Sequence, residues 1–161
     1  MPIDESASYG LVTQTTLSVM DAEEITAILR RRISRLHEPP KSDICYATTN
    51  RQKSVAAIAP RCDAVIVIGG SNSSNSRRLV EIASDPGCRE SILIESADDL
   101  DALFLNGVNT LGVTSGASTP EVLVTDLIDY LSEHFEISVE EIVIATEEVR
   151  FRLPIIANQS D

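Results

Sequence analysis

The sequence predicts an α/β fold with a mainly parallel sheet flanked by helices. Short apolar runs alternate along the chain with segments of helical spacing, and this alternation favours parallel strands joined by right-handed crossovers. Residues 64–68 read AVIVI, an unbroken apolar run that is typical of a strand covered on both faces. Small polar residues follow the predicted strands, as they do where helices begin.

The first helix is predicted by apolar residues at helical spacing, which run from Ile25 to Leu36. Ser18 or Asp21 would cap its start, and it should end before Pro39, because a residue that precedes proline avoids the helical conformation. The later elements follow from the same criteria. They are a strand at 44–46, a helix around 55–59, the strand 64–68, a helix at 75–84, a strand at 91–94, a short helix at 98–104, a strand at 109–113, a helix opened by Thr119-Pro120-Glu121, and a last strand at 141–146 or 149–153.

Composition and charge argue against several classes of function. The 161 residues carry a formal net charge of -12, include 4% aromatic residues and lack tryptophan, which disfavours binding to nucleic acids or anionic membranes. No apolar run approaches the ~20 residues of a membrane span, and the opening MPIDESASYG is too acidic for a signal or transit peptide. We therefore expect a cytoplasmic protein. The three cysteines include no CxxC pair, which argues against a disulfide framework.

Four predicted junctions before helices are rich in hydroxyl and amide side chains: residues 13–18, 45–50, 71–76 and 114–119. In a parallel sheet such junctions meet at the carboxyl edge, where open α/β sheets bind ligands. Helix N-termini there present unpaired N–H groups and the positive ends of helix dipoles, so amides and hydroxyls can hold a phosphate without lysine. Each junction alone is also explained by ordinary helix capping, and the four together favour a phosphate cradle.

The cysteines and histidines are distributed unevenly around this edge. Cys45 is the cysteine predicted to lie there, and its position alone fits a buried strand residue as well as a ligand or nucleophile. Cys62 precedes the strand 64–68 at the opposite edge, which favours a core residue, and Cys88 lies in a loop, which favours a surface thiol. His37 and His134 are predicted at helix ends, near terminal carbonyls, so no cysteine–histidine catalytic pair is expected.

Four segments of the sequence resemble motifs in the C-terminal half of the 4-hydroxy-3-methylbut-2-enyl diphosphate reductase family, and they occur in the same order: TQTTLSV, SDICYATTNRQKSV, CDAVIVIGGSNSSNSRRL and GVTSGASTPEVLV. The resemblance implies an iron–sulfur oxidoreductase of the non-mevalonate isoprenoid pathway, which converts an allylic diphosphate to isopentenyl and dimethylallyl diphosphates. It also implies that the chain contains one of three repeated α/β domains around a central [4Fe–4S] cluster.

The resemblance assigns roles to individual residues of this sequence. Cys45 matches the third cluster cysteine, whereas Thr15 and Thr48 match threonines that face the substrate. The diphosphate would be held by Ser73, Ser74, Asn75 and Ser118. The expected division of the chain is a polar lead-in at 1–10, a strand–helix part of an inter-domain region at 11–40, the C-terminal α/β domain at 41–154, and a polar tail at 155–161.

The sequence departs from the family in lacking the N-terminal half, with its other two cluster cysteines, its histidines and its catalytic glutamate, so no catalytic residue is expected here. A cubane cluster needs three or four thiolates, and Cys45 would supply one. We expect the complete enzyme to take electrons from a ferredoxin or flavodoxin, and the N-terminal half could be a separate chain. The alternative is a stand-alone diphosphate-binding or interaction module without catalysis. A location in the plastid stroma would apply if a transit peptide preceded the sequence.

Overall fold

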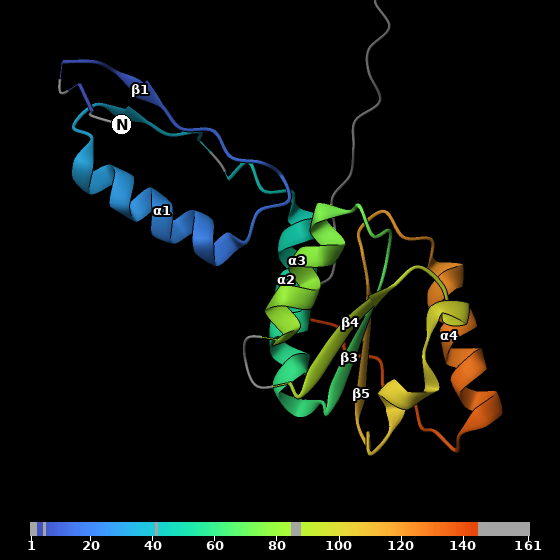
Figure 1. Cartoon of the computed structure of the whole chain (residues 1–161). Coiled ribbons are helices and arrows are strands. Elements are labelled where there is room, and N and C mark those ends of the chain that lie inside the picture. The colour runs from blue at the N-terminus through green and yellow to red at the C-terminus, as the bar shows by residue number, and fades with distance from the viewer. Residues whose placement is uncertain (1–2, 5, 41, 85–87, 145–161) are drawn as a thin grey trace, which may run out of the picture.

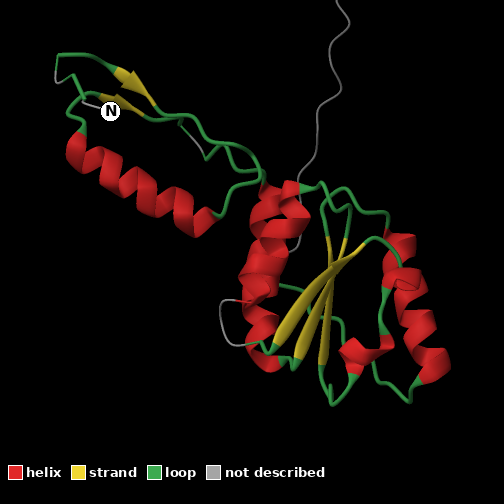
Figure 2. Ribbon diagram, in the orientation of Figure 1, coloured by secondary structure: helices red, strands yellow, loops and turns green. Residues whose placement is uncertain are grey.

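The computed structural model describes residues 3–4, 6–40, 42–84 and 88–144, in which helices and strands alternate (Figure 1, Figure 2). The α/β fold predicted from the sequence is confirmed. The elements, with η for 3-10 helices, are β1 (Tyr9–Gly10), α1 (Val19–Arg32), β2 (Leu36–His37), α2 (Tyr46–Ile58), η1 (Ala59–Arg61), β3 (Ala64–Ile68), α3 (Ser74–Ser84), β4 (Glu90–Ile94), η2 (Ala97–Asp99), η3 (Ala102–Leu105), β5 (Leu111–Ser115) and α4 (Glu121–His134).

The main sheet has parallel strands in the order β4-β3-β5. Ile68, the last residue of β3, lies opposite Ile94 and Ser115, so the carboxyl ends of the three strands meet at one edge. Every residue of β3 is buried, because helices cover both faces of the sheet (Figure 1). Burial of each isoleucine or valine in this strand contributes about 1.5–3 kcal/mol relative to exposure.

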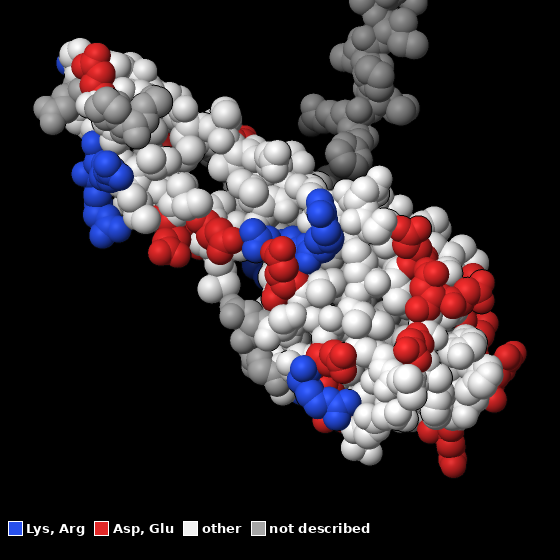
Figure 3. Space-filling view, viewed as in Figure 1, with Lys and Arg blue, Asp and Glu red and all other residues white. Residues whose placement is uncertain are grey.

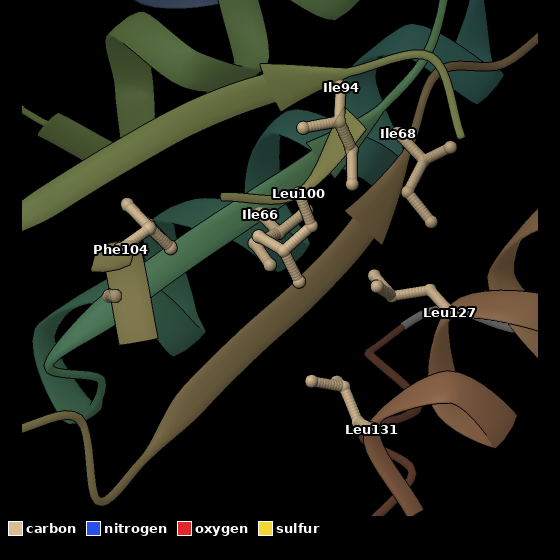
Figure 4. Close-up of a cluster of buried hydrophobic side chains, with 8 residues drawn as sticks. Ile66, Ile68, Ile94, Leu100, Phe104, Leu127 and Leu131 are labelled. Atoms are coloured by element: carbon tan, nitrogen blue, oxygen red, sulfur yellow. The ribbon is translucent and has the colours of Figure 1, made fainter. Parts of the chain in front are cut away.

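Two hydrophobic clusters lie on opposite faces of this sheet, because successive side chains of a strand alternate between its faces. On one face Ile66 and Ile68 lie toward Leu127 and Leu131 of α4, and Phe104 of η3 belongs to the same cluster (Figure 4). On the other face α2 and α3 pack on β3 in a cluster that includes Val55, Ala59, Val65, Val67 and Leu79. The helices that begin at the carboxyl edge are therefore fixed to the sheet by core packing.

A small lobe of β1, α1 and β2 stands apart from the α/β domain (Figure 1). Its two strands pair in parallel, Tyr9 with Leu36 and Gly10 with His37. No residue of α1 is buried, and Ile25 in its middle is 54% exposed. A two-stranded sheet is marginally stable by itself, and an apolar side of α1 stays exposed in the described part of the chain.

The lobe differs from the sequence-based prediction at its ends. α1 ends at Arg32 instead of running to Leu36, because Leu36 pairs with β1. β1 lies within residues 1–10, the predicted polar lead-in. His37 belongs to β2, where its Nε2 lies 2.8 Å from Ser8 Oγ, so its predicted place at a helix end is wrong.

The prediction of a strand at 44–46 is also wrong. Tyr46 is the first residue of α2, and Cys45 is its N-cap in an extended conformation. The Cys45 N–H donates to Thr15 O at 3.2 Å, and this bond ties the start of α2 to the lobe without forming a strand ladder. The apolar pattern of this stretch is explained by Ile44, which is buried in the core and 7% exposed. It does not reflect a strand of the sheet.

Smaller differences affect the last third of the chain. Two short 3-10 helices, η2 and η3, replace the helix predicted at 98–104. The strand predicted at 109–113 is β5, two residues further along. Residues 141–144 form no strand, whereas 145–146 and the alternative at 149–153 lie outside the described residues.

Charged side chains are distributed unevenly over the surface. On the face shown in Figure 3, acidic side chains gather over the α4 side of the α/β domain, whereas basic ones lie near the end of α1 and over α3. Arg78 of α3 pairs with Asp21 of α1 at 2.9 Å, which joins the lobe to the α/β domain. Among the described helices, none has the length and apolar character needed to cross a membrane.

Candidate functional site

Two loops meet at the carboxyl edge of the main sheet, one between β3 and α3 and the other between β5 and α4. Both are bonded to strand ends: Gly69 N donates to Ile94 O at 2.8 Å, and Gly116 N donates to Ile68 O at 2.9 Å. A Cβ on either glycine would collide with the hydroxyl of Ser76. Glycine at these two positions therefore lets both loops close on the first turn of α3.

Asn75, the second residue of α3, is the side chain that most clearly indicates a ligand. It is 6% exposed, and neither its Nδ2 nor its Oδ1 has a hydrogen-bond partner within the described residues. Buried polar groups are almost always paired, and leaving one unpaired costs about 1–3 kcal/mol. A ligand with acceptor oxygens at the start of α3 would satisfy the Nδ2 donor of this amide and would meet the positive end of the helix dipole.

The serines beside Asn75 have different partners. Ser73 Oγ accepts hydrogen bonds from Ser76 N at 3.3 Å and from Ser76 Oγ at 3.1 Å, as a helix cap does. Its own hydroxyl proton can still be donated to a ligand. Ser74 is exposed, and its Oγ lies 3.0 Å from Thr16 Oγ1. Helix capping and ligand binding are therefore compatible in this loop.

The loop before α4 exposes Ser118 next to a threonine with a structural role. Thr119 Oγ1 donates to Ile68 O at 3.0 Å, which ties this loop to the end of β3. The same hydroxyl lies where it would contact a Cβ on Gly69, so the two loops are neighbours. Ser118 is exposed and shares the carboxyl edge with the start of α3, as the sequence predicts.

Residues 13–18 reach this edge from the lobe and not from the main sheet. Thr15 is exposed, and its carbonyl accepts the hydrogen bond from Cys45 N. The prediction that all four polar junctions follow strands of one sheet is wrong, because 13–18 follow β1 and no strand of the main sheet precedes 45–50. Hydrogen bonds between the lobe and the α/β domain bring these segments together instead.

Cys45 is exposed at the N-cap of α2, and its thiol makes no capping bond. A buried strand residue is thereby excluded, and the alternatives of a ligand or a nucleophile stay open. Thr48, in the first turn of α2, is 2% exposed and faces the interior. Neither histidine pairs with Cys45, since His37 bonds within the lobe and His134 Nδ1 lies 2.8 Å from Tyr130 O at the end of α4, as predicted for a helix-end residue.

The other two cysteines belong to the hydrophobic cluster under α2 and α3. Cys62 packs there as predicted, and burial raises the pKa of its thiol. Cys88 is 8% exposed and donates to Glu90 O at 3.1 Å, so the prediction of a surface thiol is wrong. In the described ranges no three histidine, cysteine or carboxylate side chains are grouped so that they could hold a metal ion. Cys45 can thus offer one ligand, not a complete set.

A carboxylate lies at the rim of the loop before α3. Glu95, the residue after β4, accepts a hydrogen bond from Ser71 N at 2.9 Å. This bond lowers the pKa of the Glu95 carboxyl. The backbone N–H of Ser71 is therefore already paired. The side-chain amide of Asn75 is the better candidate to hold an anion.

Arg51 and Gln52 of α2 also contact this edge, and the sequence patterns did not predict a role for them. Arg51 Nη1 donates to Ser115 O at 3.0 Å, and Gln52 is bonded to the lobe. A signal for Gln52 was present in the sequence: it follows Thr48 by four residues and precedes Val55 by three, so it falls on the buried face of the helix. A polar residue at such a position needs hydrogen-bond partners.

Comparison with known proteins identifies a matching family and similar curated proteins. Residues 2–132 match the model of the LytB protein family. The 4-hydroxy-3-methylbut-2-enyl diphosphate reductase of Ruegeria pomeroyi is 47% identical over 157 residues, which cover 98% of this chain and 50% of that protein. Reductase 1 of Mycobacterium bovis is 52% identical over 89% of this chain and 43% of its own length.

A solved structure has the same fold. The E-1-hydroxy-2-methyl-but-2-enyl-4-diphosphate reductase from Plasmodium falciparum superposes with a TM-score of 0.77 and 36% identity, over 82% of this chain and 41% of that chain. The chain spans about half the length of the curated relatives it matches. The match to the family model includes the lobe, the main sheet and every residue of the candidate site. The chain therefore belongs to the LytB protein family.

Proposed function

We propose that this chain is the C-terminal part of a 4-hydroxy-3-methylbut-2-enyl diphosphate reductase, and that it binds the diphosphate of the substrate and supplies one ligand of the cluster. The observation that carries the proposal is Asn75, a buried amide without a partner at the start of a helix. The names of the relatives give the substrate class, a methylbutenyl diphosphate that carries a hydroxyl group.

The diphosphate would lie between the loop before α3 and the loop before α4. Asn75 Nδ2 would donate to a phosphate oxygen, and the hydroxyls of Ser73, Ser74 and Ser118 would surround it. Each charge-assisted hydrogen bond contributes roughly 1.5–3 kcal/mol. Because the N-terminus of α3 adds its dipole, the site needs no lysine.

Cys45 fits the [4Fe–4S] cluster of the reductase as one thiolate ligand, because it is exposed at the same edge. A cubane cluster needs three or four thiolates, so the other ligands would come from the other half of the reductase. The cluster, when bound, would supply electrons for reductive removal of the substrate hydroxyl, and a ferredoxin or flavodoxin would be the electron donor. The exposed Thr15, bonded to Cys45 through the backbone, would face the substrate.

Thr48 needs a separate argument because it is 2% exposed. Its hydroxyl would reach the substrate only if the residues that cover it moved when the other half of the reductase packs against this edge. The division of the chain between residues 40 and 41 is supported by the end of the lobe at β2 and the start of the α/β domain at α2. We propose a cytoplasmic location on the basis of the bacterial relatives.

A stand-alone diphosphate-binding module is the second candidate function. The observation in its favour is that the proposed diphosphate contacts all lie in the α/β domain, whereas the described residues provide no complete metal-ligand set. Such a module would bind pyrophosphate without any cluster.

A chimera tests the first proposal against the second. This chain would replace the matching half of the Ruegeria pomeroyi reductase, and the purified chimera would be assayed anaerobically with 4-hydroxy-3-methylbut-2-enyl diphosphate. We expect activity in the chimera, its loss in Cys45→Ser, and a KM raised about 10-fold in Asn75→Ala, as the loss of one charge-assisted hydrogen bond would cause. Cys62→Ala is the control and should retain activity. A folded chimera that holds a cluster but has no activity would contradict the proposal.

A further inference from the structure

We propose that Arg51 and Gln52, adjacent residues of α2, are positioning residues that fix the two ligand-facing segments of the candidate site relative to Cys45. The inference rests on the proposed function, because it concerns the same site. It extends that function to side chains that touch neither the ligand nor a metal. They act through the backbone groups to which they are bonded.

Gln52 bonds to both sides of the start of α1. Its side chain is 5% exposed; its Oε1 accepts from Val19 N at 3.0 Å, and its Nε2 donates to Leu17 O at 2.8 Å. One orientation of the amide satisfies both partners, because an N–H can only donate and a carbonyl can only accept. Both partners are main-chain groups, so Gln52 fixes the path of this segment whatever side chains it carries.

The segment fixed by Gln52 carries groups that face the site. Two residues before Leu17, Thr15 O accepts from Cys45 N at 3.2 Å. Cys45 and Gln52 are seven positions apart on one helix, a fixed spacing of about 10 Å at 1.5 Å per residue. A displacement of Leu17 away from Gln52 would therefore move Thr15 relative to Cys45.

Arg51 makes the corresponding connection to the loop before α4. Its Nη1 donates to Ser115 O at 3.0 Å and to Ser115 Oγ at 3.2 Å. Ser115 is 8% exposed and immediately precedes Gly116, the glycine that closes on Ser76. Arg51 therefore holds the end of β5 from which Ser118 is presented to the site.

Because the two residues are adjacent, one helix links three parts of the site: the thiol, the threonine segment and the Ser118 loop. A merely stabilising role predicts that substitutions lower the protection of all core amides together. Positioning predicts instead that protection falls at the tethered segments while the centre of the sheet is unchanged.

Amide hydrogen exchange of the full chain, followed by NMR, tests both residues without a ligand. In Gln52→Leu we expect the Cys45 amide to exchange about 5-fold faster or more, relative to the Val67 amide in β3, as the loss of a hydrogen-bond network worth ~1 kcal/mol would cause. In Arg51→Gln the same increase is expected at the Gly116 amide. Lys53→Ala, which changes the next residue of α2 on its exposed side, is the matched control. It should change neither the exchange rate of Cys45 nor that of Gly116 relative to Val67.

Gln52→Glu provides a readout that simple loss of stability would not give. A glutamate can accept from Val19 N, but when ionised it cannot donate to Leu17 O. We expect faster Cys45 exchange, relative to Val67, at neutral pH and recovery of the wild-type ratio as the pH falls and the carboxyl gains a proton. A ratio that is unchanged in Gln52→Leu, or independent of pH in Gln52→Glu, would overturn the positioning role of Gln52.

Pyrophosphate titration then connects the geometry to the ligand. Arg51→Gln and Arg51→Lys should both weaken binding about 3- to 10-fold, because lysine keeps the charge but not the paired contact with Ser115. If Arg51→Lys binds like the wild type and leaves the Gly116 ratio unchanged, Arg51 acts through charge alone and its positioning role is wrong. If the wild-type chain does not bind pyrophosphate, the proposed function fails, while the exchange ratios still decide the positioning roles.

Discussion

The hydroxyl oxygens of Thr16 and Ser74 lie 3.0 Å apart, although the two residues are separated by 58 positions in the sequence. Thr16 belongs to the segment that follows β1, and Ser74 is the first residue of α3. The contact therefore places a threonine-rich segment of the lobe beside the loop that would hold an anion. The Arg78–Asp21 ion pair joins the same two parts of the molecule.

A double-mutant cycle measures how strongly this contact joins the lobe to the α/β domain. Thr16→Val and Ser74→Ala should each destabilise the chain slightly, and their coupling energy should be about 0.5–1 kcal/mol, because the contact is near the surface. Urea unfolding of the two single variants and the double variant gives the value. Ser132→Ala on α4, combined with Thr16→Val, should be additive; zero coupling between Thr16 and Ser74 would contradict the contact.

We predict that the isolated chain does not hold a stable [4Fe–4S] cluster. Cys45 is the exposed thiol at the carboxyl edge, whereas Cys62 and Cys88 pack in the core. Anaerobic reconstitution followed by iron and sulfide assays is the measurement, and less than one tightly bound cluster per chain is expected after desalting. Stoichiometric iron and sulfide with persistent cluster absorbance would show that the chain provides a ligand set of its own.

The exposed apolar face of α1 should make the isolated chain self-associate. Ile25 and Ile28, three positions apart on one side of α1, are 54% and 37% exposed, and apolar patches of this kind mark surfaces that bury against a partner. Light scattering after size-exclusion chromatography should show a mass that rises with concentration, and Ile25→Lys should reduce it. Leu103→Lys, at a residue that is 72% exposed on η3, is the control. A monomer at every concentration would argue against a missing partner surface on α1.

The stability of the α/β domain should depend on the ionisation of Asp63. Its Oδ2 accepts from Asn109 N at 2.8 Å and from Thr110 N at 2.9 Å, and these bonds lower the pKa of the carboxyl from its ordinary value of 3.8. Because the folded pKa is the lower one, the stabilisation is fully present above pH ~4 and is lost as the pH falls through the folded pKa.

Urea unfolding at pH 7, pH 5 and pH 3 tests this dependence. Asp63→Asn should lower the free energy of unfolding at pH 7 and pH 5, and the difference from the wild type should shrink at pH 3. Asp129→Asn on the exposed side of α4 serves as the control. A difference that is equal at all three pH values would mean that the charge of Asp63 does not stabilise the register of β3 and β5.

The sheet could be predicted because its strands carry local signals. AVIVI identifies β3, and the Thr119-Pro120-Glu121 sequence identifies the start of α4 within a residue or two. The lobe could not be predicted in the same way, because strands of two residues, Tyr9–Gly10 and Leu36–His37, have no periodicity. Their pairing depends on a contact between distant parts of the chain.

In the candidate site, too, the position of the loops could be predicted and the environments of single side chains could not. The loops at 71–76 and 114–119 follow strands, so the shared edge was predictable from parallel topology. The environments of single side chains were not predictable from local sequence. Cys88 follows a Pro-Gly pair, which indicates a loop, yet its thiol is buried. Gln52 bonds to backbone groups 33 and 35 positions away, and no local pattern contains that information.

The central claim is that the carboxyl edge binds an anion through Asn75, and a pyrophosphate titration of the full chain followed by amide NMR tests it most directly. We predict that signals of residues 71–76 and 114–119 shift, with a dissociation constant no tighter than roughly 1 mM, about -4 kcal/mol, because the chain spans about half the length of the curated relatives it matches. Asn75→Ala should remove most of the binding, and Cys62→Ala should not. Arg30, Arg31, Arg32 and Arg35 form an alternative cationic segment at the end of α1. Shifts confined to residues 30–35, with 71–76 and 114–119 unmoved, would contradict the claim and leave these loops as helix caps.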